Sequence, residues 1–144
     1  MIYEDIPGGR ELLAWFGQEP SFHDAEIISL SLNRSGVSEL KIHGWINTGE
    51  IGPDRSFLLA KQAIVTFHLE QIMDLQLDGF SAQNVMSGLE LGYAKDRGRS
   101  NSFSLPQDPH DIDVELMPCY GLDGYIRAKK VGATFVPGCP DETD

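Results

Sequence analysis

The densest group of side chains that could do chemistry lies at residues 23–26, where a histidine and two carboxylates stand close together. His23, Asp24 and Glu26 are of the types that bind metals or exchange protons. A metal site would need further ligands, and the sequence has no HxH, HExxH or CxxC spacing to supply them. We therefore interpret the three residues as a structural junction in which His23 and Asp24 hydrogen-bond loop amides, and we predict no metal and no cofactor.

Two other histidines could still converge on a ligand. Strand alternation places His43 and His68 on solvent-facing sides of their strands. A deep pocket containing both would favour a small-molecule- or metal-binding module, and the sequence leaves that alternative open.

A second pair of carboxylates, Asp113 and Glu115, lies on one face of a predicted strand. Acid–base catalysis needs environments that separate two pKa values, usually through burial, whereas this face is expected to be solvated. We therefore assign both residues to a partner-binding surface. The sequence also lacks GxSxG, GxGxxG and a Gly-rich phosphate loop, so no catalytic residue and no enzyme activity are predicted.

Trp45 is the third candidate for partner binding. It is predicted to point outward beside a loop, where an aromatic side chain can anchor an interface. The alternative is that the N-terminal helix covers it.

The composition limits the classes of partner. The 144 residues carry 11 basic and 22 acidic side chains, a formal net charge of -11. This charge repels phosphate backbones and anionic lipids, so neither nucleic acid nor a membrane is expected to bind, and a basic protein partner is favoured. No apolar run approaches the ~20 residues that span a bilayer, and the N-terminus does not read as a signal peptide. We therefore expect a cytoplasmic protein with Cys119 and Cys139 as thiols.

The elements that must position these residues follow from periodicity. Residues 8–17 form a short helical pattern that Gly17 and Pro20 end. Residues 24–46 predict a β-hairpin with a turn at 33–36 and with Ile28, Leu30 and Leu32 pointing inward.

Further strands are expected after a loop at residues 47–56. They cover 63–69, 85–93, 111–117 and 125–137, while 72–77 is either a strand or a helical turn. In strand 85–93, Val85, Leu89, Leu91 and Tyr93 are expected on one face. The polar stretch at 95–109 predicts a mobile loop.

Together these elements predict an α+β fold: one mostly antiparallel sheet of about six to eight strands with a short N-terminal helix packed on it. We expect a single domain over residues 1–144, with an N-terminal helical segment at 1–20, a β-rich core at 21–137 and an acidic tail at 138–144.

Several short segments resemble a family of small bacterial immunity proteins from polymorphic-toxin systems. The distinctive motif is FHDAEI at residues 22–27, and the likeness extends over residues 15–17, 65–67, 75–80 and 83–85. Together these segments span most of the chain, from Trp15 to Pro137. The resemblance implies a non-enzymatic protein that binds and blocks a cognate toxin, and the acidic charge of the chain favours a basic one. The alternatives are a small-molecule- or metal-binding module and a scaffold domain that forms homodimers through an exposed edge strand.

Overall fold

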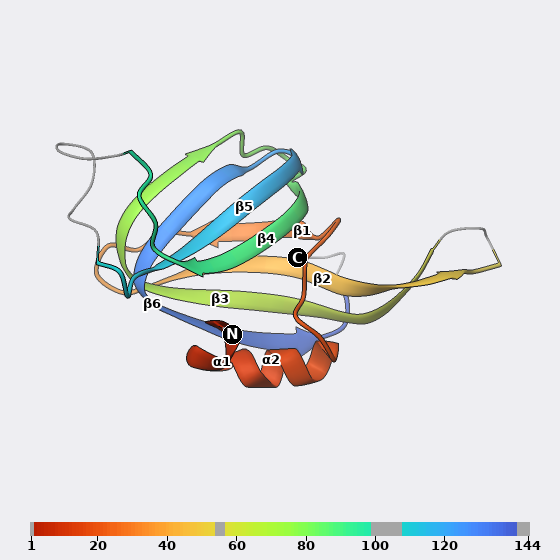
Figure 1. Cartoon of the computed structure of the whole chain (residues 1–144). Helices are drawn as coiled ribbons and strands as arrows, with labels where there is room; N and C mark the ends of the chain where they lie inside the picture. The colour runs from red at the N-terminus through yellow and green to blue at the C-terminus, as the bar shows by residue number, and fades with distance from the viewer. Residues whose placement is uncertain (1, 54–56, 99–107, 141–144) are drawn as a thin grey trace.

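The computed structural model describes residues 2–53, 57–98 and 108–140, excluding the side chains of residues 47–51 and 57–60. In these residues two helices precede six strands: α1 (Ile2–Asp5), α2 (Gly9–Phe16), β1 (Glu26–Ser31), β2 (Val37–Ile51), β3 (Phe57–Asp78), β4 (Val85–Tyr93), β5 (Ile112–Tyr120) and β6 (Asp123–Pro137). The strands form a closed antiparallel barrel in the order β1-β2-β3-β6-β5-β4 (Figure 1). The α+β fold expected from the sequence is confirmed.

The short helix α2 packs on the sheet, as predicted, and a helix of this length is not stable alone. Its buried residues Leu12 and Phe16 face the core, and Phe16 packs edge-on against Phe22. Gly17, at φ 73°, ends the helix by donating its amide to the carbonyl of Leu13 at 2.8 Å. Figure 1 places both helices beside β3 and β6. None of the helices in the described residues is long and apolar enough to cross a bilayer.

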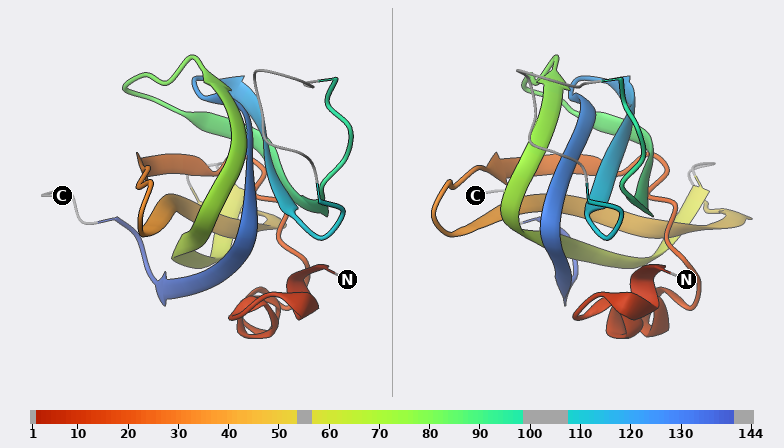
Figure 2. Two further views of the ribbon diagram at one scale, coloured as in Figure 1. Left: turned by 90° about the vertical axis from the view of Figure 1, so that its left-hand side faces the viewer. Right: turned by 60° about the vertical axis from the view of Figure 1, so that its left-hand side comes forward.

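The strands β2 and β3 are longer than predicted. The loop expected at residues 47–56 is wrong in its bounds, because β2 continues to Ile51 and β3 begins at Phe57, while residues 54–56 lie outside the described part. Their far ends project as an arm beyond the barrel (Figure 1). The strand predicted at 63–69 and the ambiguous segment 72–77 form one strand, which kinks at Lys61 and Gln71, both at positive φ. β3 and β6 run side by side and bend together (Figure 2).

The inward face predicted for the first strand is wrong for Ile28 and Leu32. Ile27 is buried, whereas Ile28 is 40% exposed, because a β-bulge between Ile27 and Ser29 shifts the alternation by one residue. Leu32 is exposed and lies beyond the end of β1 at Ser31. Leu30 still faces the core side, half-buried.

The bounds predicted for β4, residues 85–93, are confirmed. The single face predicted for its apolar residues is confirmed only in part. Leu89 is buried and Leu91 packs partly buried against the core, whereas Tyr93 is exposed and donates its hydroxyl to Asp5 at 2.9 Å. Met86, which alternation did not select, is fully buried because register shifts flank it in the pairing with β5.

The barrel closes between β1 and β4 through the segment at residues 21–27. Only Glu26 and Val85 pair as ladder partners. Four backbone hydrogen bonds extend the closure: Asp24 N to Met86 O (2.9 Å), Met86 N to Ala25 O (2.9 Å), Ile27 N to Asn84 O (2.8 Å) and Leu89 N to Ser21 O (3.1 Å). Phe22 and Asp24 adopt φ of 58° and 63°, the left-handed region that bulky residues rarely occupy. The Phe22 ring is buried between Phe16 and Phe67, and this packing holds the strained backbone.

We expect the left-handed conformation of Asp24 to determine which substitutions it tolerates. Asp24→Gly should leave the free energy of unfolding within about 0.5 kcal/mol of wild type, because glycine adopts positive φ without strain. Asp24→Val should lower it by about 1–2 kcal/mol, because a β-branched residue clashes in this conformation. Urea denaturation of both variants tests this. Equal stability of the two variants would contradict the closure geometry described here.

Candidate functional site

The segment at residues 21–27, which closes the barrel, is joined to β4 partly by the predicted junction residues. The Nδ1 atom of His23 lies 3.0 Å from the carbonyl oxygen of Ser87, so the ring bonds a carbonyl rather than the expected loop amide. Its Nε2 atom is 3.6 Å from a carboxylate oxygen of Asp24, with both side chains more than half exposed. Asp24 contributes mainly through its backbone, and Glu26 is exposed. These contacts are local to the barrel closure, and the role of the three residues as a structural junction stays a prediction.

The histidines His43 and His68 do not share a site. The Nε2 atom of His43 lies 3.1 Å from Gln62 Oε1, and that of His68 lies 2.8 Å from Thr134 Oγ1. Within the described residues, no group of three His, Cys, Asp or Glu side chains could hold a metal ion. The convergence that would have favoured a metal-binding module is therefore not found in this part of the chain.

Trp45 lies half-buried on β2, and its ring packs edge-on against His43 at a centroid distance of 4.8 Å. Trp45 was expected either to point outward or to be covered by the N-terminal helix. Its contact with the outward-facing His43 fits the outward orientation.

The solvated face expected for Asp113 and Glu115 is wrong for Asp113, which is only 3% exposed. Arg127 donates to both carboxylate oxygens of Asp113, at 2.7 and 3.1 Å, and Arg97 donates to one of them at 3.2 Å. Arg97 also bonds Glu115 at 3.0 Å and lies over the Tyr125 ring. Buried carboxylates require such partners. This charged cluster on the outer face of β5 and β6 is thus largely satisfied internally.

The segment directly after β4 covers the charged cluster. Arg97 reaches back over β5 from this segment, and Arg127 donates to the carbonyl of Lys95 at 2.6 Å. The sequence signal that could have revealed this is the pair Lys95 and Arg97 directly after a strand, within a polar stretch that we predicted only as a mobile loop. Asp113 is therefore not available to a partner on this face.

We expect Glu115 to stabilise the protein in a pH-dependent way. The hydrogen bond from Arg97, reinforced by the charges of Arg97 and Lys95, lowers the pKa of Glu115 below its ordinary value, although burial opposes this. Stabilisation from a lowered carboxyl pKa is present above the ordinary value and is lost as pH falls through the folded-state pKa. Glu115→Gln should therefore lower the free energy of unfolding on the order of 1 kcal/mol at pH 7, and the difference should vanish in acid. Urea denaturation from pH 7 to pH 3 measures it, and a difference independent of pH would contradict the assignment.

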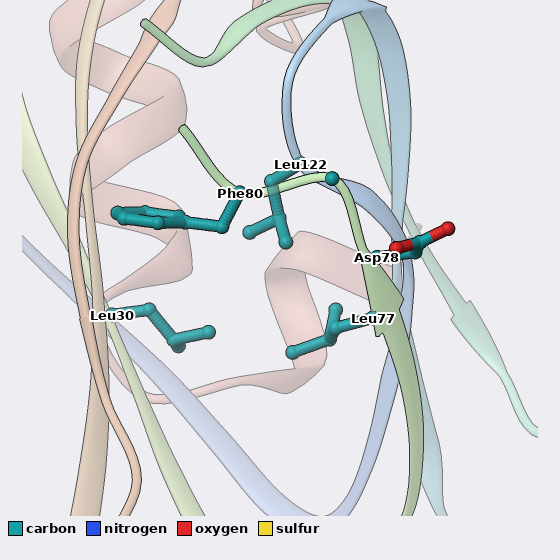
Figure 3. Close-up of a pocket in the computed structure, with 6 residues that line it drawn as sticks. Leu30, Leu77, Asp78, Phe80 and Leu122 are labelled. Atoms are coloured by element: carbon teal, nitrogen blue, oxygen red, sulfur yellow. The ribbon is translucent and has the colours of Figure 1, made fainter. Parts of the chain in front are cut away.

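One open hollow among the described residues lies at one mouth of the barrel. Six residues line it, and we call the four with apolar side chains the apolar cup: Leu30, Leu77, Phe80 and Leu122. The hollow has a volume of about 370 Å³, and Phe80 is 59% exposed. Figure 3 shows the four side chains around one space, while the carboxylate of Asp78 points away from it.

A second hollow of about 360 Å³ adjoins the apolar cup and shares Leu77 and Asp78 with it. It is also lined by Asp123, which lies directly opposite Asp78 in the ladder between β3 and β6. We call Asp78 and Asp123 the acidic rim. Among the described residues, no hydrogen bond or ion pair involves either carboxylate, in contrast to Asp113.

Asn84 holds the loop of this mouth in place. Its buried Oδ1 atom accepts the amides of Ser81 (3.0 Å) and Leu122 (3.1 Å), and its Nδ2 atom donates to the carbonyl of Ser81 (2.9 Å). Gly79 and Gly121, both at positive φ, allow the two turns to approach, since a Cβ on Gly79 would lie 2.7 Å from the Gly121 carbonyl oxygen. The sequence did not identify this mouth, because the residues that line it come from separate segments of the chain.

Comparison with family models, with curated proteins and with solved structures finds no significant match to this chain. The resemblance to immunity proteins therefore stays a prediction.

We expect Asn84→Ala to lower the free energy of unfolding by about 2–3 kcal/mol, because it leaves two amides without their acceptor. Gln83→Ala, next to it on the same loop, is the matched control and should change stability by less than about 0.5 kcal/mol, since the Gln83 side chain is exposed. Chemical denaturation compares the two. Equal losses would show that Asn84 does not organise the mouth.

Proposed function

We propose that this chain is a non-enzymatic binding protein of the immunity type, which neutralises a basic protein toxin in the cytoplasm by covering the toxin's working surface. The observation that carries the proposal is the barrel mouth, where an exposed aromatic ring and an open apolar cup adjoin two carboxylates that have no ion-pair partner among the described residues. Exposed apolar patches with a polar rim are typical of protein-binding surfaces.

The net charge of -11 supports a basic partner. A strongly acidic protein attracts a cationic one over distances of about 10 Å at moderate ionic strength, and this raises the rate of encounter. Once the two surfaces meet, an aromatic anchor such as Phe80 becomes buried and holds the complex together. Inhibition then requires only that the bound protein blocks access to the toxin's site.

A small-molecule-binding module is the second candidate, because the volume of the cup falls within the range of ligand pockets. Such pockets also place several polar groups toward the ligand. Here the one charged side chain of the lining, Asp78, turns its carboxylate away from the cup, which favours the protein-binding proposal.

The test is affinity capture with the purified chain from lysate of its source organism, supplemented with the products of neighbouring genes, followed by mass spectrometry. We expect a stoichiometric basic protein whose toxicity or activity the chain suppresses. Capture and suppression should be lost with Phe80→Ser and kept with Val136→Ser, which changes an equally exposed apolar side chain on the distant end of β6.

Two outcomes would contradict the proposal. If the captured protein keeps its activity in the complex, the chain is not its inhibitor. Co-purification of a metabolite without any protein partner would instead favour the small-molecule module.

A further inference from the structure

The apolar cup is open because β3 extends past the β1–β2 hairpin. β3 pairs with β2 up to Glu70, and among the described residues the ladder partners of Ile72 to Asp78 all lie on β6. The other edge of this part of β3 faces the side of the barrel where Leu30 lies on β1 (Figure 3). Backbone groups along an open strand edge are ready to pair with an extended segment of another chain.

Inside this opening the lining is apolar. Leu122 is buried and Leu30 and Leu77 are half-buried, so an inserted aliphatic or aromatic side chain would contact apolar groups on several sides. Phe80 is mostly exposed at the margin and would lose its contact with water when the cup is filled. The cup therefore suits an apolar side chain.

The acidic rim indicates which kind of partner side chain should lie next to the apolar one. Asp78 and Asp123 stand directly opposite each other in an antiparallel ladder, where like charges destabilise the pairing. By contrast, the carboxylate of Asp113 on β5 is compensated internally by Arg127 and Arg97. In the described part of the chain no cation is paired with the acidic rim. A cation supplied by a partner would relieve this repulsion.

We infer that the mouth binds an extended segment of a basic partner protein, with one apolar side chain in the apolar cup and an adjacent lysine or arginine between Asp78 and Asp123. The two hollows share Leu77 and Asp78, so neighbouring side chains of one segment can fill both. This inference rests on the proposed function and specifies the chemistry of the partner at that site.

The test is a titration of the ¹⁵N-labelled full chain with synthetic peptides, followed by amide chemical shifts. The probe peptide has a leucine between a lysine and an arginine, and two matched peptides replace the basic residues by glutamine or the leucine by glycine. With the probe peptide, we expect amide shift changes confined to residues 76–84 and 121–124. Either replacement in the peptide, or added salt, should weaken the affinity about five-fold or more.

Variants separate the two parts of the site. Asp78→Asn with Asp123→Asn should remove the preference for the basic peptide, and Phe80→Ser should remove the preference for leucine. Glu11→Gln and Val136→Ser, which alter an exposed charge on α2 and an exposed apolar side chain on β6, should change neither. Spectra with unchanged dispersion verify that each variant is folded.

The inference is overturned if the probe peptide causes no shift at the mouth, or if the glutamine peptide binds equally well. Either result would leave the proposed function intact where the chain still neutralises a toxin and Phe80→Ser abolishes that neutralisation. Conversely, peptide binding at the mouth without any suppressed toxin would refute the proposed function and leave the inference standing.

Discussion

Closure of the barrel between β1 and β4 is the constraint on which the rest of the structure depends. A single ladder pair joins the two strands, and the segment at residues 21–27 supplies the other backbone hydrogen bonds. To reach β4 this segment adopts the left-handed conformation at Phe22 and Asp24, which is unfavourable for a bulky residue such as Phe22, whereas aspartate adopts it more readily. The buried Phe22 ring, packed between α2 and β3, offsets that strain and at the same time docks the N-terminal helix.

Asn84 connects this closure to the barrel mouth. Its carbonyl accepts the amide of Ile27 at the closure, while its side chain accepts the amides of Ser81 and Leu122 at the mouth. The same residue therefore fixes β1, the loop after β3 and the turn before β6 relative to one another. A binding surface assembled this way is pre-formed, so a partner does not have to order it on binding.

The sequence was sufficient for the parts of the fold that local periodicity controls. The helix ended by Gly17, the hairpin with its turn at residues 33–36 and the strand at 85–93 are all present. It was insufficient where tertiary contacts override alternation. The bulge after Ile27 moves Ile28 outward, and two arginines distant in sequence bury Asp113. The mouth was missed because Leu30, Phe80 and Leu122 come from three separate segments, and only the folded barrel brings them together.

The central claim is that the barrel mouth is the surface that contacts the partner. Hydrogen–deuterium exchange of the chain, free and bound to the partner it captures, tests this most directly. We predict slower exchange on binding at residues 72–84 and 121–124, with the outer face of β5 and the helices unchanged. Protection confined to the outer face of β5, around Asp113 and Glu115, or to the arm formed by β2 and β3, would contradict the claim and place the interface elsewhere.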